Sequence, residues 1–332
     1  MGPAPKRNPT AMKATAVAHP IQGLLKYHGF RDPEHNVPAH DSISVCTAPS
    51  RTRTTVAFEG NRETDSVTVD GEPVDDEGAT RARTVLDLVR VHAGIDRGAR
   101  VRSVNTFESN VGLGASASAY AALAKAATDA AGLSLSRREL SRLARRGAAS
   151  AARSVVGGFA HLRTATAPAD AVAEPVPTGF DEDLRIVIAS LPERKYTSRA
   201  HASTPDSPYF EARLAGVHET AADLRRAIRR GDFDETFGIA ERESIELLAV
   251  TMTGPEGWLY WRPETLSVLA MARELREEGV PVYFSADTGA TAYLNTTATA
   301  VDRVREAVED AGIPTRVWKV GGGVRQVEDH LF

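Results

Sequence analysis

The chain has 332 residues, more than a single hydrophobic core usually spans. Apolar residues make up 42% and charged residues 25%, which is typical of a globular enzyme and excludes a largely disordered chain. Forty basic against 44 acidic residues give a net charge of −4, which disfavours nucleic acid as a partner. No apolar run approaches the length of a membrane-spanning helix, so no membrane partner is expected either.

The single cysteine, Cys46, excludes an internal disulfide framework, fits a reducing cytoplasm and is expected to be a core residue. Residues 1–12 lack the apolar segment of a secretory signal and are expected to be a tag or a disordered extension. Only six of the 40 basic residues are lysines, so each lysine is of interest.

In the first half, the predicted strands are rich in β-branched residues or alternate in polarity, at 14–19, 42–47, 53–58, 65–70 and 100–107. Helices are predicted at 81–93 and, over an alanine-rich stretch, at 115–131. Ser136 and Glu139 have the spacing of a capping box, which predicts another helix start. Gly147 interrupts that helix, and a short helix then carries Arg153.

Residues 166–182 are rich in proline, alanine and acidic residues and are the predicted domain boundary. Beyond them, strands are predicted at 184–189, 280–286 and 315–320, and helices at 208–230, 233–250, 264–278 and 298–311. Alternating strands and helices predict an α/β or α+β fold, with domains at 13–180 and 181–332.

The strongest local feature is a glycine- and serine-rich loop between a predicted strand and a helix, Gly112-Leu113-Gly114-Ala115-Ser116-Ala117-Ser118. Glycines allow close approach of a ligand, and the free N–H groups of a helix start favour phosphate. The hydroxyls of Ser116 and Ser118 are candidates for contact with phosphate oxygens or Mg²⁺. A plain helix start packed on a sheet is the alternative interpretation. No Gly-Lys-Ser/Thr follows, so this is not a Walker loop.

This loop resembles the phosphate loop of the GHMP kinase superfamily. Four further segments, in order along the chain, resemble the mevalonate diphosphate decarboxylase family. They are Lys26-Tyr27-His28-Gly29-Phe30-Arg31-Asp32, Asp41-Ser42-Ile43-Ser44-Val45, Arg145-Arg146-Gly147-Ala148-Ala149-Ser150-Ala151-Ala152-Arg153-Ser154, and Phe284-Ser285-Ala286-Asp287-Thr288-Gly289.

The resemblance implies a two-domain GHMP-kinase-like fold, with a ribosomal-S5-like N-terminal domain and a ferredoxin-like C-terminal domain. It also implies ATP and Mg²⁺ as cofactors. The family's chemistry phosphorylates a tertiary hydroxyl so that it can leave, and loss of CO₂ then supplies the electron pair of an alkene. A phosphorylated mevalonate is the implied small-molecule substrate, and a homodimer is an assembly that the sequence leaves open.

The resemblance also implies roles for individual residues. Asp287 would lie beside the substrate hydroxyl, where a carboxylate orients it or accepts its proton. Lys26 would stabilise developing negative charge, and Arg153 would bind the substrate carboxylate through its planar fork. The alternatives are a turn-capping aspartate, a surface lysine and an exposed helix arginine.

Further substrate contacts are implied for Tyr27, for Ser150, and for Ser198 and Arg199 in the Lys195-Tyr196-Thr197-Ser198-Arg199 loop, which is otherwise a solvated charged loop. Ser116, in the phosphate loop, is the candidate metal contact. The histidines at 19, 28, 35 and 40 have no spacing typical of a zinc site.

Two positions depart from the family pattern. Phe30 replaces a lysine and Ala148 a serine, which removes a cation and a hydroxyl donor near the expected diphosphate. The pattern resembles the archaeal variant that converts phosphomevalonate to isopentenyl phosphate. Three alternatives stay open: a diphosphomevalonate decarboxylase, a mevalonate-type 3-kinase without decarboxylation, and a non-catalytic nucleotide-binding relative.

Overall fold

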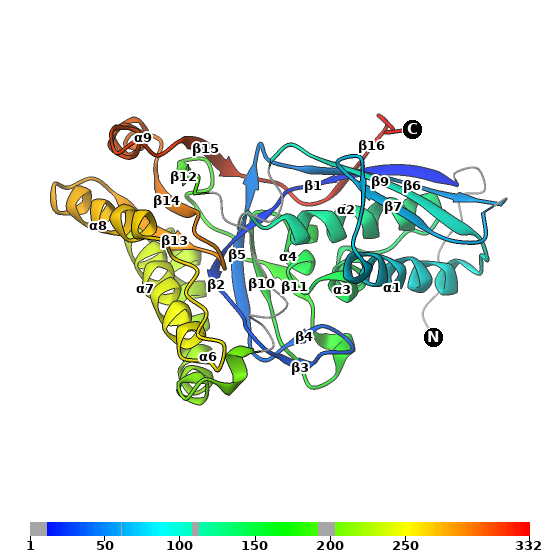
Figure 1. The fold of residues 1–332 in the computed structure, drawn as a ribbon, viewed down its shortest axis with the longest axis horizontal. Coiled ribbons are helices and arrows are strands. Elements are labelled where there is room, and N and C mark those ends of the chain that lie inside the picture. The colour runs from blue at the N-terminus through cyan, green and yellow to red at the C-terminus, as the bar shows by residue number, and fades with distance from the viewer. Residues whose placement is uncertain (1–11, 61, 108–112, 192–202) are drawn as a thin grey trace.

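The computed structural model describes residues 12–60, 62–107, 113–191 and 203–332. Its main elements are two β-sheets with helices packed against them (Figure 1). The predicted extension at 1–12 lies outside the described residues except for Met12. None of the helices in these ranges is long and apolar enough to cross a membrane.

The first sheet is formed mainly by the N-terminal part of the chain. In spatial order it contains β16 (Arg325–Val327), β1 (Lys13–Ala18), β6 (Thr52–Glu59), β9 (Gly98–Asn105), β7 (Ser66–Val69) and β8 (Glu72–Pro73). Helix α2 (Ala115–Ala130) packs directly on this sheet. Residues of α1 (Asp76–Ala93), α3 (Arg137–Gly147) and α4 (Ala151–Val156) belong to the same apolar cluster. Small alanine side chains along α2 let this helix pack closely on β1 and β6.

The second sheet contains strands from both halves of the chain. Its order is β11 (Ala173–Pro175), β10 (Phe159–Leu162), β5 (Ser42–Ala48), β15 (Thr315–Val320), β12 (Leu184–Ala189), β14 (Ala292–Thr297) and β13 (Val282–Ala286), and β2 (Ile21–Leu25) also pairs with β5. The described remainder comprises the hairpin of β3 (Phe30–Asp32) and β4 (Val37–Pro38), helices α6 (Phe210–Arg230), α7 (Phe233–Met252), α8 (Pro263–Glu277) and α9 (Val301–Asp310), and the short η1 (Pro168–Asp170) and η2 (Thr204–Asp206).

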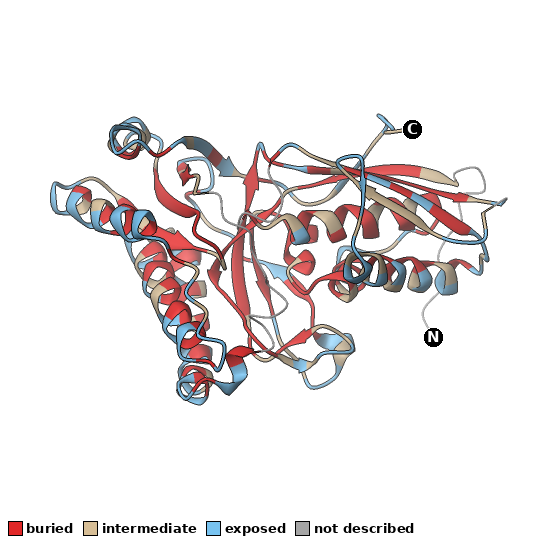
Figure 2. Ribbon diagram, viewed as in Figure 1, coloured by how far each residue is buried: buried red, intermediate tan, exposed pale blue. Residues whose placement is uncertain are grey.

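Buried residues concentrate on the strands and on the sheet-facing sides of the helices, while the outer sides of α6, α7 and α8 are exposed (Figure 2). One apolar cluster contains residues from both halves, including Leu24, Ile43, Ile186 and Ile228. Strand β15 pairs with β5, and β16 pairs with β1. The second sheet is therefore continuous across the predicted boundary at 180, and the domain division stays a prediction.

Most predicted elements agree with the structure, including the capping box of Ser136 and Glu139 at the start of α3. Helix α1 begins earlier than predicted because Asp75 caps it, accepting a hydrogen bond from the backbone N–H of Gly78 at 2.7 Å. The expected linker at 166–182 contains η1 and β11. Since β11 is an edge strand, its proline is tolerated there. Cys46 is fully buried, and burial raises its pKa to about 12.

Candidate active site

Lys26 and Asp287 lie just beyond the ends of two strands, β2 and β13. A buried Gln22 holds these strands together, because its amide donates to Ser285 Oγ at 3.0 Å on β13 and to Asn295 Oδ1 at 2.9 Å on β14. The neighbouring Gly23 N–H donates to Asp287 Oδ1 at 3.0 Å. The two residues predicted as catalytic are therefore brought together by strands far apart in sequence.

Gly23 sets the close spacing of these two side chains. A Cβ at this position would lie 2.7 Å from Lys26 Cγ and 3.1 Å from Asp287 Oδ1. Any larger residue would push the lysine stem away from the carboxylate. The sequence did not single out Gly23, since a lone glycine within a strand signals only a bulge or a close approach.

Lys26 is almost completely buried, with 6% of its surface exposed. Burial lowers the pKa of its ammonium, and the negative charges of Asp287 and Glu243 oppose this effect. The ammonium donates to Ser244 Oγ at 3.1 Å. The alternative of a surface lysine is therefore wrong.

Arg153, on α4, is also buried, with 3% exposed. Its guanidinium lies 5.8 Å from the centre of the Tyr27 ring. Within the described parts of the chain, its Nε and Nη1 atoms make no hydrogen bond. Burial lowers its pKa, opposed by Tyr27 and Asp287. A buried guanidinium with unpaired donors is suited to an anionic ligand such as a carboxylate.

Tyr27 and Ser150 lie close to this arginine. Tyr27 is buried, and burial raises the pKa of its hydroxyl, while the charge of Arg153 and a hydrogen bond with the Ser150 backbone oppose the shift. Ser150 precedes α4 and is partly exposed. Ser198 and Arg199 lie outside the described residues, and so does Gly112 of the predicted phosphate loop.

The rest of the predicted phosphate loop leads directly into α2. Leu113 and Ala117 are buried, Ala115 packs against the core, and Ser116 is exposed. Ser118 is fully buried: its hydroxyl pairs with Thr52 Oγ1 at 2.7 Å and donates to the Ala115 carbonyl at 3.2 Å. The Ser118 hydroxyl therefore has its partners inside the protein and does not face a phosphate.

The backbone at position 114 requires a glycine. Gly114 has φ +70°, and a Cβ there would lie 2.4 Å from the carbonyl oxygen of Ile21 on β2. The loop is predicted to bind ATP phosphates at this helix start, so we expect Gly114→Ala to lower the affinity for ATP about tenfold or more, because the helix start must move away from β2. Gly231→Ala is the matched control, since Gly231 has φ +68° with nothing closer than 3.9 Å. Nucleotide titration of both folded variants checks this, and equal ATP affinities would contradict it.

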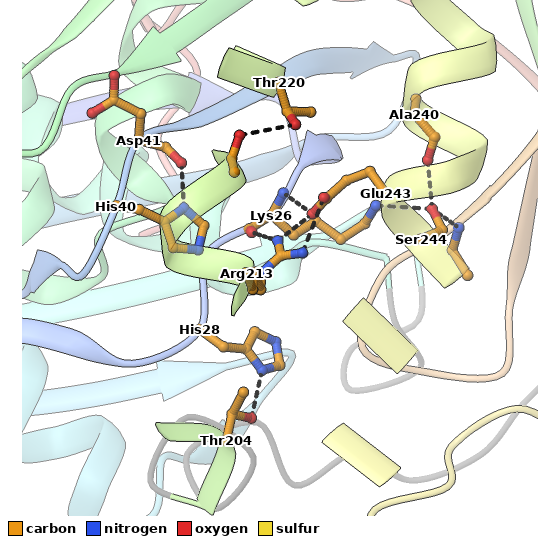
Figure 3. Close-up of polar contacts among 12 residues, drawn as sticks. Lys26, His28, His40, Asp41, Thr204, Arg213, Thr220, Ala240, Glu243 and Ser244 are labelled. Carbon is orange, nitrogen blue, oxygen red and sulfur yellow. Dashed lines mark hydrogen bonds and ion pairs between the residues drawn. The ribbon is translucent and has the colours of Figure 1, made fainter. Parts of the chain in front are cut away.

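Three residues that the sequence did not single out surround Lys26: Arg213 on α6, and Glu243 and Ser244 on α7 (Figure 3). Glu243 forms a buried ion pair with Arg213 and accepts from the Lys26 N–H at 3.1 Å. Arg213 donates to the Lys26 carbonyl at 2.8 Å. The sequence shows Glu243 only as a glutamate on the apolar side of a predicted amphipathic helix. That position alone does not indicate which residue it would contact.

The histidines make hydrogen bonds within the protein. His28 pairs with Thr204 at 3.0 Å, and His40 Nδ1 with the Asp41 carbonyl at 2.7 Å. Burial lowers the pKa of His40 to about 4. In the described part of the chain, no group of three or more His, Cys, Asp or Glu side chains is arranged to hold a metal ion.

Comparison with known proteins identifies the family. Residues 18–173 match the model described as the diphosphomevalonate decarboxylase-like N-terminal domain. The chain is 52% identical to the phosphomevalonate decarboxylase of Haloferax volcanii over 319 residues, covering 96% of this chain and 98% of that protein.

Solved structures agree with this match. Mevalonate diphosphate decarboxylase from Staphylococcus aureus superposes with a TM-score of 0.91 at 28% identity, covering 96% of this chain and 99% of that one. A structure described as MDDEF in complex with MVAPP, AMPPCP and magnesium gives a TM-score of 0.89 at 28% identity, covering 96% and 100%. The predicted GHMP-kinase-like fold is confirmed. The chain belongs to the mevalonate diphosphate decarboxylase family, as its sequence motifs predicted.

Proposed function

We propose that this protein converts phosphomevalonate and ATP to isopentenyl phosphate, CO₂, ADP and phosphate. The observation that carries the proposal is the 52% identity, over nearly the whole chain, to a phosphomevalonate decarboxylase. Diphosphomevalonate decarboxylases match at lower identity, such as 27% for the Candida albicans protein. The buried Lys26, Arg153 and their neighbour Asp287 supply the charged groups that this chemistry needs.

In the proposed reaction, the C3 hydroxyl oxygen of the substrate attacks the γ-phosphorus of ATP, and ADP leaves. Asp287 orients the hydroxyl and accepts its proton. The C3–O bond then breaks with loss of phosphate, and the bond between C2 and the carboxylate carbon breaks with loss of CO₂. The electron pair of this carbon–carbon bond forms the π bond of the alkene between C2 and C3. Lys26 stabilises the negative charge of the phosphorylated intermediate, and Arg153 holds the carboxylate in line.

Mg²⁺ is the proposed metal. The described residues include no group of three or more His, Cys, Asp or Glu side chains that could hold it, so they fit an ion with few protein ligands. Mg²⁺ usually takes few protein ligands and is held largely through nucleotide phosphates. The exposed Ser116 hydroxyl at the start of α2 is the proposed protein contact. When bound, the metal neutralises phosphate charge. The N–H groups at the start of α2 contribute to binding the ATP phosphates.

The direct test compares CO₂ release from mevalonate, its 5-phosphate and its 5-diphosphate, each with ATP. We expect the 5-phosphate to give the highest kcat/KM. ATP hydrolysis without CO₂ release would indicate a 3-kinase instead. Background hydrolysis with all three compounds would indicate a non-catalytic nucleotide-binding protein.

The preference for a monophosphate is supported by the surroundings of Tyr27. Phe30 packs against the Tyr27 ring edge to face at 5.8 Å, and Ala148 is 5% exposed at the end of α3. An apolar ring and a methyl group thus stand where relatives would have a cation and a hydroxyl. Each lost charge-assisted contact is worth about 1.5–3 kcal/mol.

We expect the double variant Phe30→Lys/Ala148→Ser to shift the kcat/KM ratio toward the diphosphate by about tenfold or more. Phe30 is only partly buried, so a lysine stem can pack there with its ammonium in solvent. Phe30→Met/Ala148→Ser, which lacks the new charge, is the control. Wild-type preference for the diphosphate by about tenfold would show that both replacements are packing changes.

A further inference from the structure

Lys26 directly follows the last residue of β2 that pairs with a neighbouring strand. The last pair between β2 and β5 joins Leu25 to Ile43. The peptide groups of Lys26 therefore need partners from elsewhere. The Lys26 N–H donates to Glu243 Oε1 at 3.1 Å, and its carbonyl accepts from Arg213 Nη2 at 2.8 Å. Both peptide groups of this one residue are thus held by side chains from two helices.

Glu243 and Arg213 are bound to each other as well as to the lysine. They form a two-pronged ion pair, in which Arg213 Nη1 donates to Glu243 Oε2 at 3.1 Å and Nη2 contacts Oε1. Their side chains are 1% and 4% exposed. A buried ion pair contributes little to stability, and an apolar pair of similar volume is often at least as stable. Stability alone therefore does not account for these two residues.

The next residue on α7 contacts the other end of Lys26. Ser244 Oγ accepts from Lys26 Nζ at 3.1 Å and from the Ala286 N–H at 3.3 Å, and it donates to the Ala240 carbonyl at 2.9 Å. These three bonds use the full hydrogen-bonding capacity of a hydroxyl. Because Ala286 directly precedes Asp287, Ser244 ties the ammonium to the backbone that carries the carboxylate.

We propose that Glu243, Arg213 and Ser244 form a Lys26 cradle, a set of positioning residues that holds the lysine's peptide and ammonium in the orientation used in catalysis. This proposal rests on the proposed decarboxylase function. None of the three needs to touch the substrate. Their effect on the reaction is transmitted through Lys26.

The first experiment replaces the ion pair by neutral groups of similar volume, Glu243→Gln/Arg213→Met. This variant leaves no buried charge unpaired, so it should fold. We expect kcat for CO₂ release to fall about tenfold or more, while KM for phosphomevalonate changes less than about threefold. A merely structural pair would leave kcat of the folded variant unchanged, and a kcat within twofold of wild type overturns the proposal.

The chain offers a matched control on the same helix. Glu241 forms an ion pair with Arg276. Glu241 accepts a hydrogen bond from the Phe284 N–H at 3.0 Å, and Arg276 donates one to the Val282 carbonyl at 2.8 Å. This is the same type of backbone clamp, but it holds a strand already paired along its length with β14. Glu241→Gln/Arg276→Met should therefore keep kcat within about twofold. An equal loss of kcat in both double variants would overturn a specific role of the cradle.

The single variants test the electrostatic part of the cradle. Lys26 faces Asp287 beyond β13, Glu243 on α7, Arg213 on α6 and Arg153 on α4. Glu243→Gln removes a negative neighbour, so the lysine should lose its proton at lower pH, by about one pH unit. Arg213→Met removes a positive neighbour, so the shift should be upward. Shifts in the same direction would contradict the cradle.

A readout without catalysis separates this proposal from the proposed function. The chain has only six lysines, so ¹³C-lysine NMR resolves each titration, and Lys26→Arg assigns the signal. If wild type releases no CO₂ from any mevalonate derivative, the proposed function fails even where the opposite pH shifts are seen. If wild type is active but the Lys26 titration is identical in all variants, the cradle fails alone.

Ser244→Ala tests contact with the ammonium itself. Alanine keeps the helix and removes only the hydroxyl, so we expect kcat to fall about tenfold with little change in KM for ATP. Ser141→Ala is the control, because Ser141 is also buried with two backbone partners, the Ala152 carbonyl and the Ala173 N–H. Equal kcat values in the two folded variants would remove Ser244 from the cradle.

Discussion

Asp287→Asn should reduce kcat for alkene formation by about two to four orders of magnitude while leaving ATP affinity nearly unchanged. Asparagine keeps the shape of the side chain, and its Oδ1 can still accept from the Gly23 N–H that bonds Asp287 at 3.0 Å. The local backbone should therefore be preserved. What is lost is the negative charge that orients the hydroxyl, accepts its proton and interacts with Lys26. Rapid-quench measurement of CO₂ and nucleotide titration give the two quantities.

The control for this prediction is Asp183→Asn. Asp183 also accepts a backbone N–H, that of Ala298 at 3.1 Å, but it is exposed and outside the site. The Asp183→Asn variant should therefore keep most of its kcat for alkene formation. If Asp287→Asn retains more than about a tenth of kcat, equivalent to about 1.4 kcal/mol, Asp287 has no catalytic role.

The candidate site residues could be picked out from the sequence because they fall in ordered motifs, and their catalytic roles stay predictions. Lys26, Arg153 and Asp287 were each ambiguous alone, and their order along the chain, at the family's spacing, favoured the functional interpretation. The structure adds why they meet. Strand β2 contains Gln22 and Gly23, polar or small residues that obscure a strand pattern, so its pairing with β5 was not predicted. That strand carries Lys26 to Asp287.

The cradle around Lys26 could not be predicted from the pattern. Glu243 and Arg213 lie in two helices that read as ordinary amphipathic segments rich in charged residues. Which charge faces inward depends on how α6 and α7 pack on β2, and no local rule fixes that. Ser118 shows the opposite case. Its position in a glycine-rich loop favoured a phosphate contact, while the helix turns its hydroxyl toward Thr52 in the core.

Arg153 carries the second large prediction, in which activity and stability change in opposite directions. Folding buries its guanidinium, lowers its pKa and leaves Nε and Nη1 without partners among the described residues. A pKa lowered by folding means that the charged form is disfavoured in the folded state. Since the side chain is charged at neutral pH, the unliganded protein tolerates an unfavourable buried charge. A substrate carboxylate would supply the missing partner.

We therefore expect Arg153→Met to reduce kcat/KM at least a hundredfold, or about 2.7 kcal/mol, and to raise the free energy of unfolding of the unliganded protein by about 1–3 kcal/mol.

Arg145→Met is the control, for which the free energy of unfolding should change in the opposite direction. Burial lowers the pKa of Arg145 as well, to about 10, so the two arginines differ in their hydrogen bonds rather than in their burial. The guanidinium of Arg145 donates to the His35 and Pro168 carbonyls at 2.8 and 2.7 Å. Its loss leaves two carbonyls unpaired and should destabilise the fold by about 1–3 kcal/mol. Urea unfolding without ligand measures both variants. Destabilisation by Arg153→Met equal to that by Arg145→Met would show that Arg153 serves the fold rather than a bound carboxylate.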